Sequence, residues 1–272
     1  MTAMNASTEI GFGPAAATRR IATDRSVGGR LVYAFGDVHG RYDLLKALLA
    51  RVWDDCAGRA AGRPPVLIFC GDYIDRGPQS AEVLDALNWL GRRTDIQLHL
   101  LIGNHEQAML DFLQDPEQAA AWLQFGGAET LVSYGVEPPL NDADGPALVR
   151  ARDALLEHLP AAHLLLLQRL ELTVTYGDCA FVHAGVRPGI PLARQARSDL
   201  LWIRSDFLDF EGSHERFVVH GHTWTDDLPQ LRPNRLGLDT GAYATGVLTA
   251  ARIEDGALAF LQTPQQRPPG LT

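Results

Sequence analysis

The chain of 272 residues has few cysteines, no long apolar run and no excess of basic side chains. Its three cysteines are widely spaced and form neither a zinc-binding nor a redox pair, which fits a reducing cytoplasm. No apolar run approaches the roughly 20 residues that span a bilayer. The N-terminus is not followed by the short apolar segment that a secretory signal contains. We therefore expect a cytoplasmic protein that does not insert into a membrane.

The charge balance is acidic, with 24 Lys and Arg against 33 Asp and Glu and a formal net charge of -9. A broad nucleic-acid interface, or a surface for anionic lipids, calls for a basic face that this balance disfavours. Anionic substrates are not excluded, because bound metal ions reverse the sign of the local field. Hydrophobic residues make up 46% of the chain, enough for a sizeable core.

The chain divides into one main domain with two short flanking segments. Residues 1–29 are rich in Ala, Gly and Thr and predict a flexible lead-in. Residues 263–272 are rich in Pro and predict a flexible tail. Residues 30–262 are expected to form the domain.

Three apolar runs in the first half are each followed by a polar, Gly-rich loop. The runs are 31–35, 66–70 and 96–102, and helical apolar spacing follows the first two loops, as at Leu44, Leu45, Leu48 and Leu49. Strand, loop and helix in repetition predict an α/β fold with a largely parallel sheet. Ligands of such sheets lie beyond the carboxyl ends of the strands, where these loops would be.

The second half shows a different pattern. Residues 107–170 read as mostly helical and predict a helical insertion rather than an independent domain. Strand-like runs follow it as far as residue 262, and we expect them to pair mainly in the antiparallel direction.

Carboxylate, imidazole and amide groups recur at the ends of the predicted strands. The residues are Asp37, His39, Asp72, Asn104, His105, His183, His220 and His222. Each alone has an ordinary explanation, since Asp after Gly is usually a turn or a helix cap. Turn chemistry does not explain why His recurs in four of these loops. The groups are ligands for hard or borderline divalent metals, so together they favour a metal site.

The order of these loops resembles a known family. The motifs are GDVHG at 36–40, GDYIDRG at 71–77, GNHE at 103–106, HAG at 183–185 and GHT at 221–223. They are similar to those of PPP-type serine/threonine protein phosphatases of the calcineurin-like metallophosphoesterase superfamily, and most similar to the small bacterial and phage enzymes related to lambda phosphatase. The resemblance implies an α/β sandwich of two mixed sheets flanked by helices, with a helical insertion.

The resemblance also implies a dinuclear metal centre. Asp37 and His39 would bind the first metal, Asp72 would bridge both, and the second would be completed by Asn104, His183 and His222. Two such cations lower the pKa of a bridging water, so that hydroxide attacks phosphorus directly at neutral pH. Mn²⁺ is the expected metal, and the ligand types also permit Fe or Zn.

The remaining roles concern the leaving group and the phosphate. The resemblance implies that His105 is the general acid and that Asp75 orients it. Arg76 matches the family's phosphate-binding Arg, and we expect Arg204 to be a second phosphate ligand, because arginine's planar fork suits phosphate oxygens. Arg187 and Tyr243 are further candidates.

Several positions outside these roles have structural interpretations. Gly126, Gly127, Glu129 and Thr130 lie where related enzymes turn near the site, and a role in loop geometry is expected. His220 is expected to lie behind the metal ligands or in the core. Ile102 stands where many PPP enzymes carry an Arg, so one phosphate contact is missing or comes from elsewhere. Trp224 stands where many non-PPP metallophosphoesterases carry another metal-binding His, which favours the PPP branch.

The expected activity is hydrolysis of phosphoserine and phosphothreonine in proteins, with phosphotyrosine and small phosphomonoesters as further substrates. The enzymatic alternative is a hydrolase of nucleotides or dinucleoside polyphosphates, which typically loses the Asp-Arg pair that is intact here at 75–76. The non-enzymatic alternative is a silent phosphoprotein-binding module, which is disfavoured because every expected ligand is present. The sequence contains no indication of an oligomeric state.

Overall fold

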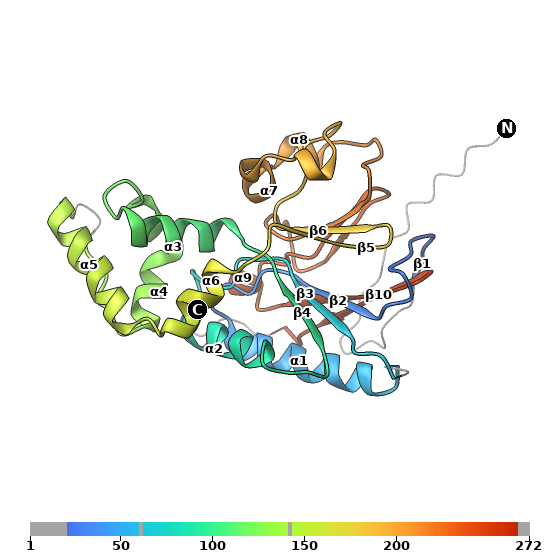
Figure 1. Ribbon diagram of the computed structural model, residues 1–272, viewed down its shortest axis with the longest axis horizontal. Coiled ribbons are helices and arrows are strands. Elements are labelled where there is room, and N and C mark those ends of the chain that lie inside the picture. Colours follow the sequence, from blue (N-terminus) through green and yellow to red (C-terminus); the bar gives the residue numbers. More distant parts are fainter. Residues whose placement is uncertain (1–20, 60–61, 141–142, 266–272) are drawn as a thin grey trace.

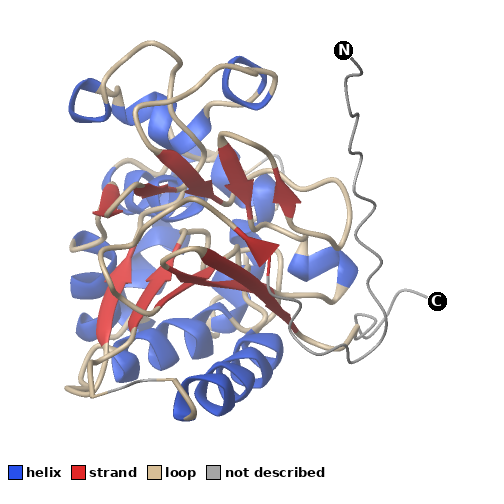
Figure 2. Cartoon of the chain, turned by 90° about the vertical axis from the view of Figure 1, so that its right-hand side faces the viewer, coloured by secondary structure: helices blue, strands red, loops and turns tan. Residues whose placement is uncertain are grey.

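Two β-sheets stack on one another and are flanked by helices (Figure 1, Figure 2). The computed structural model describes residues 21–59, 62–140 and 143–265. The first sheet contains, in spatial order, β1 (Ile21–Ala22), β11 (Ala257–Gln262), β10 (Thr249–Glu254), β2 (Val32–Phe35), β3 (Val66–Phe69) and β4 (Gln97–Leu100). The second contains β5 (Thr173–Tyr176), β6 (Cys179–Val182), β7 (Phe217–His220), β9 (Arg235–Gly237) and β8 (Gln230–Leu231). The predicted α/β sandwich of two mixed sheets is confirmed.

The helices fall into three groups. The long α1 (Tyr42–Ala57) and α2 (Ser80–Leu90) cover the outer face of the first sheet (Figure 1). The predicted helical insertion comprises α3 (Asn104–Gln114), a kinked turn (Leu123–Gly127), α4 (Ala128–Ser133), α5 (Gly145–His158) and α6 (Ala161–Gln168). The second sheet is accompanied by a short turn (Leu192–Arg194), α7 (Arg197–Trp202) and α8 (Ser205–Leu208), and α9 (Ala242–Thr245) precedes β10. None of the described helices combines the length and apolarity that crossing a membrane requires.

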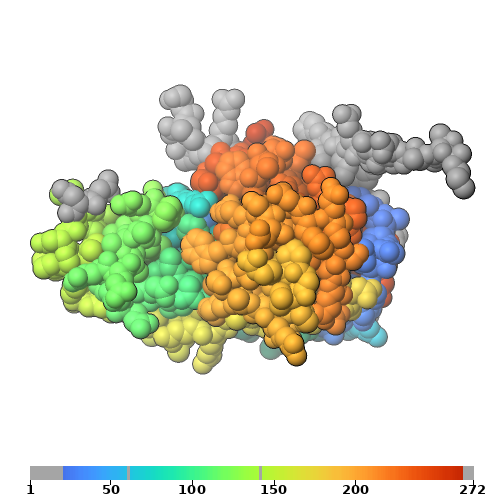
Figure 3. All heavy atoms as spheres, turned by 90° about the horizontal axis from the view of Figure 1, so that it is seen from above, coloured from blue at the N-terminus to red at the C-terminus, as the bar shows by residue number. Residues whose placement is uncertain are grey.

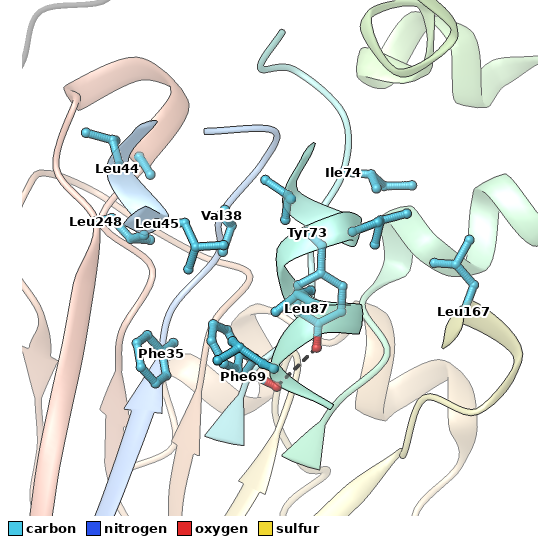
Figure 4. Close-up of a cluster of buried hydrophobic side chains, with 14 of the residues drawn as sticks. Phe35, Val38, Leu44, Leu45, Phe69, Tyr73, Ile74, Leu87, Leu167 and Leu248 are labelled. Atoms are coloured by element: carbon cyan, nitrogen blue, oxygen red, sulfur yellow. Dashed lines mark hydrogen bonds between the residues drawn. The ribbon is translucent and has the colours of Figure 1, made fainter. Parts of the chain in front are cut away.

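The continuous apolar runs of β2 and β3 arise because both faces of the first sheet are covered. Tyr33 and Phe35 point to the core shared with α1 and α2, whereas Val32 and Ala34 point to the core between the two sheets. Phe35 and Phe69 stack across the parallel pair β2–β3 with ring centroids 4.1 Å apart, as Figure 4 shows. This packing fixes the strand ends from which the polar loops emerge.

The predicted helical spacing after the first loop is confirmed in α1. Leu44, Leu45, Leu48 and Val52 are fully buried and lie on the side of α1 that faces the sheet. Burying such a side chain contributes about 1.5–3 kcal/mol. The helix is therefore held by its apolar side, and its first turn stays next to the loop that carries Asp37.

The expectation of mainly antiparallel pairing after residue 170 is wrong for the middle of the second sheet. β6, β7 and β9 are parallel, while β5–β6, β8–β9 and β10–β11 are antiparallel. Parallel neighbours need a long crossover connection. The crossover between β6 and β7 contains α7 and α8. The short strand patterns carried no signal for strand direction. Because β6 and β7 run in parallel, His183 and His222 follow strand ends at one edge.

Parts of the two predicted flexible segments contact the first sheet. β1 pairs with β11 through Ile21 and Ala22, and Val27 is buried. At the other end Thr263 is also buried and exchanges hydrogen bonds with Leu248. The rest of the predicted lead-in, residues 1–20, and of the tail, residues 266–272, lies outside the described residues.

Candidate metal centre

The predicted metal ligands meet where the carboxyl ends of the parallel strands converge. Asp37, Asp72 and Asn104 follow β2, β3 and β4 of the first sheet, and His183 and His222 follow β6 and β7 of the second. All of these side chains and that of His39 are buried. Two sheets thus contribute to one cluster, although the ligands are separated by as many as 185 positions along the chain.

Asp72 stands between two groups of candidate ligands. Its Oδ2 lies 3.5 Å from Nε2 of His39, and its Oδ1 lies 3.4 Å from Nε2 of His183. Potential ligand atoms of His39, Asp72 and His105 form one compact group, and those of Asp72, His183 and His222 form another. One carboxylate with an oxygen toward each group is the arrangement that a bridging ligand needs.

The second group is completed by Asn104. Its Oδ1 lies 2.8 Å from Nε2 of His183 and 2.9 Å from Nδ1 of His222, and the two ring nitrogens are 3.1 Å apart. Donors that share a cation at about 2.1 Å lie about 3.0–3.4 Å from one another. The four side chains therefore fit a common divalent ion with little movement.

Two buried polar atoms at the centre have no hydrogen-bond partner among the described residues. They are Oδ1 of Asp37 and Nε2 of His222. The other carboxylate oxygen of Asp37 accepts a hydrogen bond of 2.8 Å from the backbone N–H of His222. A buried carboxylate oxygen without a donor is costly, and a cation held with His39 and Asp72 would satisfy it.

The protonation states at the centre also suit metal binding, which requires neutral imidazoles and ionised carboxylates. Burial lowers the pKa of His39 to about 3 and that of His222 to about 2, and it also lowers the pKa of His183. Burial alone would raise the pKa of Asp72, but the surrounding imidazoles, His183 first, bring it below its usual range. Burial and the nearby Asp239 raise the pKa of Asp37, so positive charge is needed to keep the Asp37 carboxylate ionised.

The loops of the centre carry unusual backbone conformations. Among the described residues, the non-glycine positions with positive φ are His39, Asp72, Asp75, Arg76 and His222, with values between 45° and 72°. All five are predicted site residues. Such conformations cost about 1–3 kcal/mol each and persist where the surrounding structure enforces them. The backbone strain is therefore concentrated in the loops whose side chains converge on the candidate metal centre.

Glu106 is one of the groups that enforce this geometry. Its buried carboxylate accepts backbone hydrogen bonds from Asp72 at 2.9 Å, Tyr73 at 2.7 Å and Gly103 at 2.9 Å. A Cβ atom on Gly103 would lie 2.0 Å from Oδ1 of Asp72, so only glycine fits there. Sequence reasoning included Glu106 in a motif but gave it no role; it ties the Asp72 loop to the start of α3.

His105 and Asp75 form the predicted pair beside the ligands. Nδ1 of His105 lies 2.6 Å from Oδ2 of Asp75, and both side chains are buried. Burial opposes the charged imidazole, but Asp72 and Asp75 outweigh it and raise the pKa of His105. The other ring nitrogen, Nε2, lies 3.1 Å from Nη2 of Arg76. Because a guanidinium only donates hydrogen bonds, Nε2 is the acceptor in this contact. An imidazole held by a carboxylate at Nδ1 is suited to carry a proton at Nε2 once Arg76 turns to a bound anion.

Residues of the helical insertion hold Asp75, and sequence reasoning largely missed them. Trp122 donates a hydrogen bond of 2.8 Å to Oδ2 of Asp75, and Thr130 donates one of 2.6 Å to Oδ1. The expected role of Gly126 in loop geometry agrees with its φ of 110° and with the hydrogen bond of 3.2 Å that its carbonyl accepts from Arg76. Thr130 does more than shape the turn, since its side chain hydrogen-bonds to Asp75.

The predicted phosphate ligands differ in their placement. Arg76 lies over the ring of Tyr243 at 4.7 Å, and Tyr243 lies 5.3 Å from the ring of His39. Arg76 and Arg204 line one cavity together with Asn104 and His105. Arg187 is instead paired with Asp199 at 2.6 Å and with Asp206 at 2.8 Å. The structure thus brings Arg76, Arg204 and Tyr243 to the centre, whereas Arg187 is held by two carboxylates that are not candidate metal ligands.

Two further positions behave as expected. The side chain of Ile102 is buried in the interior, so this position supplies no phosphate contact. His220 is fully buried; its Nε2 lies 3.3 Å from Nη1 of Arg235 and its Nδ1 lies 2.9 Å from the carbonyl oxygen of Gly221, next to the candidate ligand His222. Its pKa is lowered to about 3 by burial, so it is a neutral core residue.

Comparison with known proteins identifies the class that this fold and centre define. Residues 31–234 match the family model of calcineurin-like phosphoesterases, and the chain belongs to that family. It is 28% identical to serine/threonine-protein phosphatase 2 of Escherichia coli over 83% of this chain and 94% of the other. It is 27% identical to the symmetrical bis(5'-nucleosyl)-tetraphosphatase of a Janthinobacterium strain over 88% and 98%. The solved structure of a candidate diadenosine tetraphosphatase has the same fold, with a TM-score of 0.55 and 19% identity over 89% and 98%.

Proposed function

We propose that this phosphoesterase is a protein phosphatase that hydrolyses phosphoserine and phosphothreonine, and that it accepts phosphotyrosine and small phosphomonoesters as well. The observation that carries the proposal is the pair His105–Asp75, at 2.6 Å, beside the candidate metal ligands and the Arg76 guanidinium. Serine and threonine alkoxides are poor leaving groups, so their departure needs a proton from a positioned acid.

Each residue then has a definite task. When bound, the two divalent cations supply an activated hydroxide at neutral pH and offset the charge of the phosphate. Arg76 and Arg204 bind phosphate oxygens, and the ring of Tyr243 packs against the guanidinium of Arg76. His105 gives its Nε2 proton to the leaving oxygen, while Asp75 fixes the ring through Nδ1.

We infer that Mn²⁺ occupies both positions in vitro, with Fe or Zn as further candidates. The donors comprise carboxylates, imidazoles and one amide oxygen. This mixed set suits several first-row metals, and availability decides among them.

Dinucleoside polyphosphate hydrolysis is the second candidate. It is supported by the similarity to the symmetrical bis(5'-nucleosyl)-tetraphosphatase, 98% of whose length aligns with this chain. The intact Asp75–Arg76 pair and the buried hydrogen bonds around Asp75 support the monoesterase instead, because a phosphate leaving group needs less help from an acid.

The test compares p-nitrophenyl phosphate, a phosphoserine peptide and diadenosine tetraphosphate, with purified protein and added Mn²⁺. Asp72→Asn and His105→Asn are run beside wild type, with Asp54→Asn and His158→Asn as matched controls at exposed positions outside the site. The proposal is supported if wild type and the controls hydrolyse the first two substrates and the two site variants do not. Turnover of diadenosine tetraphosphate alone supports the second candidate, and no turnover despite bound metal supports a silent binding module.

A further inference from the structure

A groove extends from the metal centre along the helical insertion. It is a cavity of about 790 Å³, and Arg76, Asn104 and His105 line its inner end. A cavity of this size accommodates a ligand much larger than a phosphoryl group. Whatever carries the phosphate therefore has room to contact the protein beyond the centre.

One face of α3 forms the floor of this groove. Asn104, Ala108, Asp111 and Asp115 all line it, and their spacing places them in a row along the helix. The row starts at a candidate metal ligand and ends at the residue that caps the helix. The groove therefore follows the axis of α3 away from the centre.

Two exposed aromatic side chains belong to the lining. Phe125, from the kinked turn before α4, is 64% exposed, and Trp202, at the end of α7, is 50% exposed. The segments around α3 and around α7–α8 lie next to each other in the view of Figure 3. Exposed aromatic residues next to a cavity are typical of surfaces that bind a polypeptide.

The charges of the groove change sign along its length. Arg76 and Arg204 lie at the end that holds the metal ligands, and Asp111 and Asp115 lie farther along α3. Asp111 accepts a hydrogen bond from Gln107, and Asp115 accepts one from the backbone of Gln118. Within the described part of the chain, neither carboxylate forms an ion pair with a lysine or arginine.

We propose that this groove selects phosphopeptide segments that carry an arginine or lysine two to four residues from the phosphorylated residue. The inference rests on the proposed protein phosphatase activity. Along the helix axis, Asp111 and Asp115 lie about 9 and 15 Å from His105, at about 1.5 Å per residue. An extended peptide covers these distances in about three to five residues, at about 3.3 Å each. Because the long side chain of arginine or lysine covers part of the distance itself, about two to four residues are enough.

The same charges disfavour a dinucleoside polyphosphate in this groove. Beyond the phosphate at the centre, such a substrate continues with further negative phosphates. Those phosphates would approach Asp111 and Asp115, and like charges in proximity repel. The acidic stretch thus separates the two candidate substrate classes by charge.

The experiment measures kcat/KM for a series of phosphoserine peptides with Arg, Ala or Glu at each position two, three or four residues before or after the phosphoserine. Wild type is compared with the double variant Asp111→Asn/Asp115→Asn. The control Asp54→Asn/Glu157→Gln makes the same change in net charge at exposed helix positions that do not line the groove. p-Nitrophenyl phosphate and diadenosine tetraphosphate are assayed in parallel.

We expect wild type and the control to prefer the best Arg peptide over its Ala counterpart by roughly fivefold, and the Glu peptide to be worst. In the double variant the Arg-to-Ala ratio falls to about one, and high salt reduces the wild-type ratio because it screens exposed charges. Equal ratios for wild type and the double variant would overturn the groove assignment while leaving the phosphatase activity intact. Turnover of the two non-peptide substrates without any peptide turnover would overturn the proposed function itself.

Discussion

The indole Nε1 of Trp122 donates a hydrogen bond of 2.8 Å to the carboxylate oxygen of Asp75 that also lies 2.6 Å from His105. Trp122 belongs to the helical insertion, whereas Asp75 and His105 belong to the loops of the first sheet. The insertion therefore positions the proposed general acid through Asp75. It would then contribute to the proposed catalytic pair in addition to forming a wall of the groove.

Replacing Trp122 by Phe keeps the aromatic packing against Phe112 but removes the N–H donor. We expect kcat to fall about tenfold for phenyl phosphate or a phosphoserine peptide, whose leaving groups need protonation. p-Nitrophenyl phosphate, whose leaving group departs without a proton, should lose less than about twofold. Trp89→Phe makes the same change at an exposed position and should alter neither rate. An equal loss for all substrates would show that Trp122 acts only through stability.

The dinuclear arrangement predicts different metal stoichiometries for three variants. His39→Asn should retain one Mn²⁺ per chain and His183→Asn the other, because the two residues lie in separate groups around Asp72. Asp72→Asn should weaken both sites, since its two oxygens face both groups. Elemental analysis after dialysis, together with the electron spin coupling of the Mn²⁺ pair, provides the measurement. Two tightly bound ions in Asp72→Asn would contradict a bridging role.

Much of the fold could be predicted from sequence because local patterns encode it directly. The runs that form β2 and β3 are apolar on both faces, and the leucines of α1 have helical spacing. The direction of β7 could not be predicted, because four residues are too few to distinguish a parallel from an antiparallel pair. That direction depends on the crossover through α7 and α8, which is a property of the tertiary structure.

The candidate site divides in the same way. The candidate metal ligands lie within short motifs at strand ends, so they could be recognised from the sequence. Trp122 lies outside those motifs, and only folding places its indole at Asp75. The pairing of Arg187 with Asp199 is likewise invisible in sequence, where any arginine after a motif looks available.

Gly126 provides a test of how the insertion is joined to Arg76. Its φ is 110°, and a Cβ atom would lie 2.6 Å from the backbone nitrogen of Arg76. Gly126→Ala should destabilise the protein by about 1–3 kcal/mol and should raise KM several-fold, because Arg76 must shift. Urea unfolding and steady-state kinetics measure the two effects. Gly135→Ala, where φ is 74° but no atom lies within 4 Å, separates backbone strain from the contact with Arg76. A normal KM for Gly126→Ala would show that Arg76 tolerates the displacement.

An ion pair far from the centre predicts how stability depends on pH. Arg252 of β10 is 3% exposed and lies 2.7 Å from Oδ2 of Asp55, which also accepts a hydrogen bond of 2.8 Å from Tyr33. Burial opposes ionisation of Asp55, but the bonds from Arg252 and Tyr33 outweigh it and lower its pKa below the ordinary value. A lowered pKa stabilises the folded state above the ordinary pKa of about 3.9, and this stability is lost as pH falls through the lower, folded-state value.

Asp55→Asn should therefore lower the free energy of unfolding by about 1–2 kcal/mol at pH 7, the partial exposure of Asp55 limiting the effect. The difference from wild type should shrink below about pH 4, where Asp55 of the unfolded wild type becomes protonated. Urea unfolding at a series of pH values measures both quantities. Asp153→Asn breaks an exposed pair with Arg152 and should change stability by less than about 0.5 kcal/mol. A difference for Asp55→Asn that stays constant from pH 7 to pH 3 would mean that the loss comes from packing and not from the charge of Asp55.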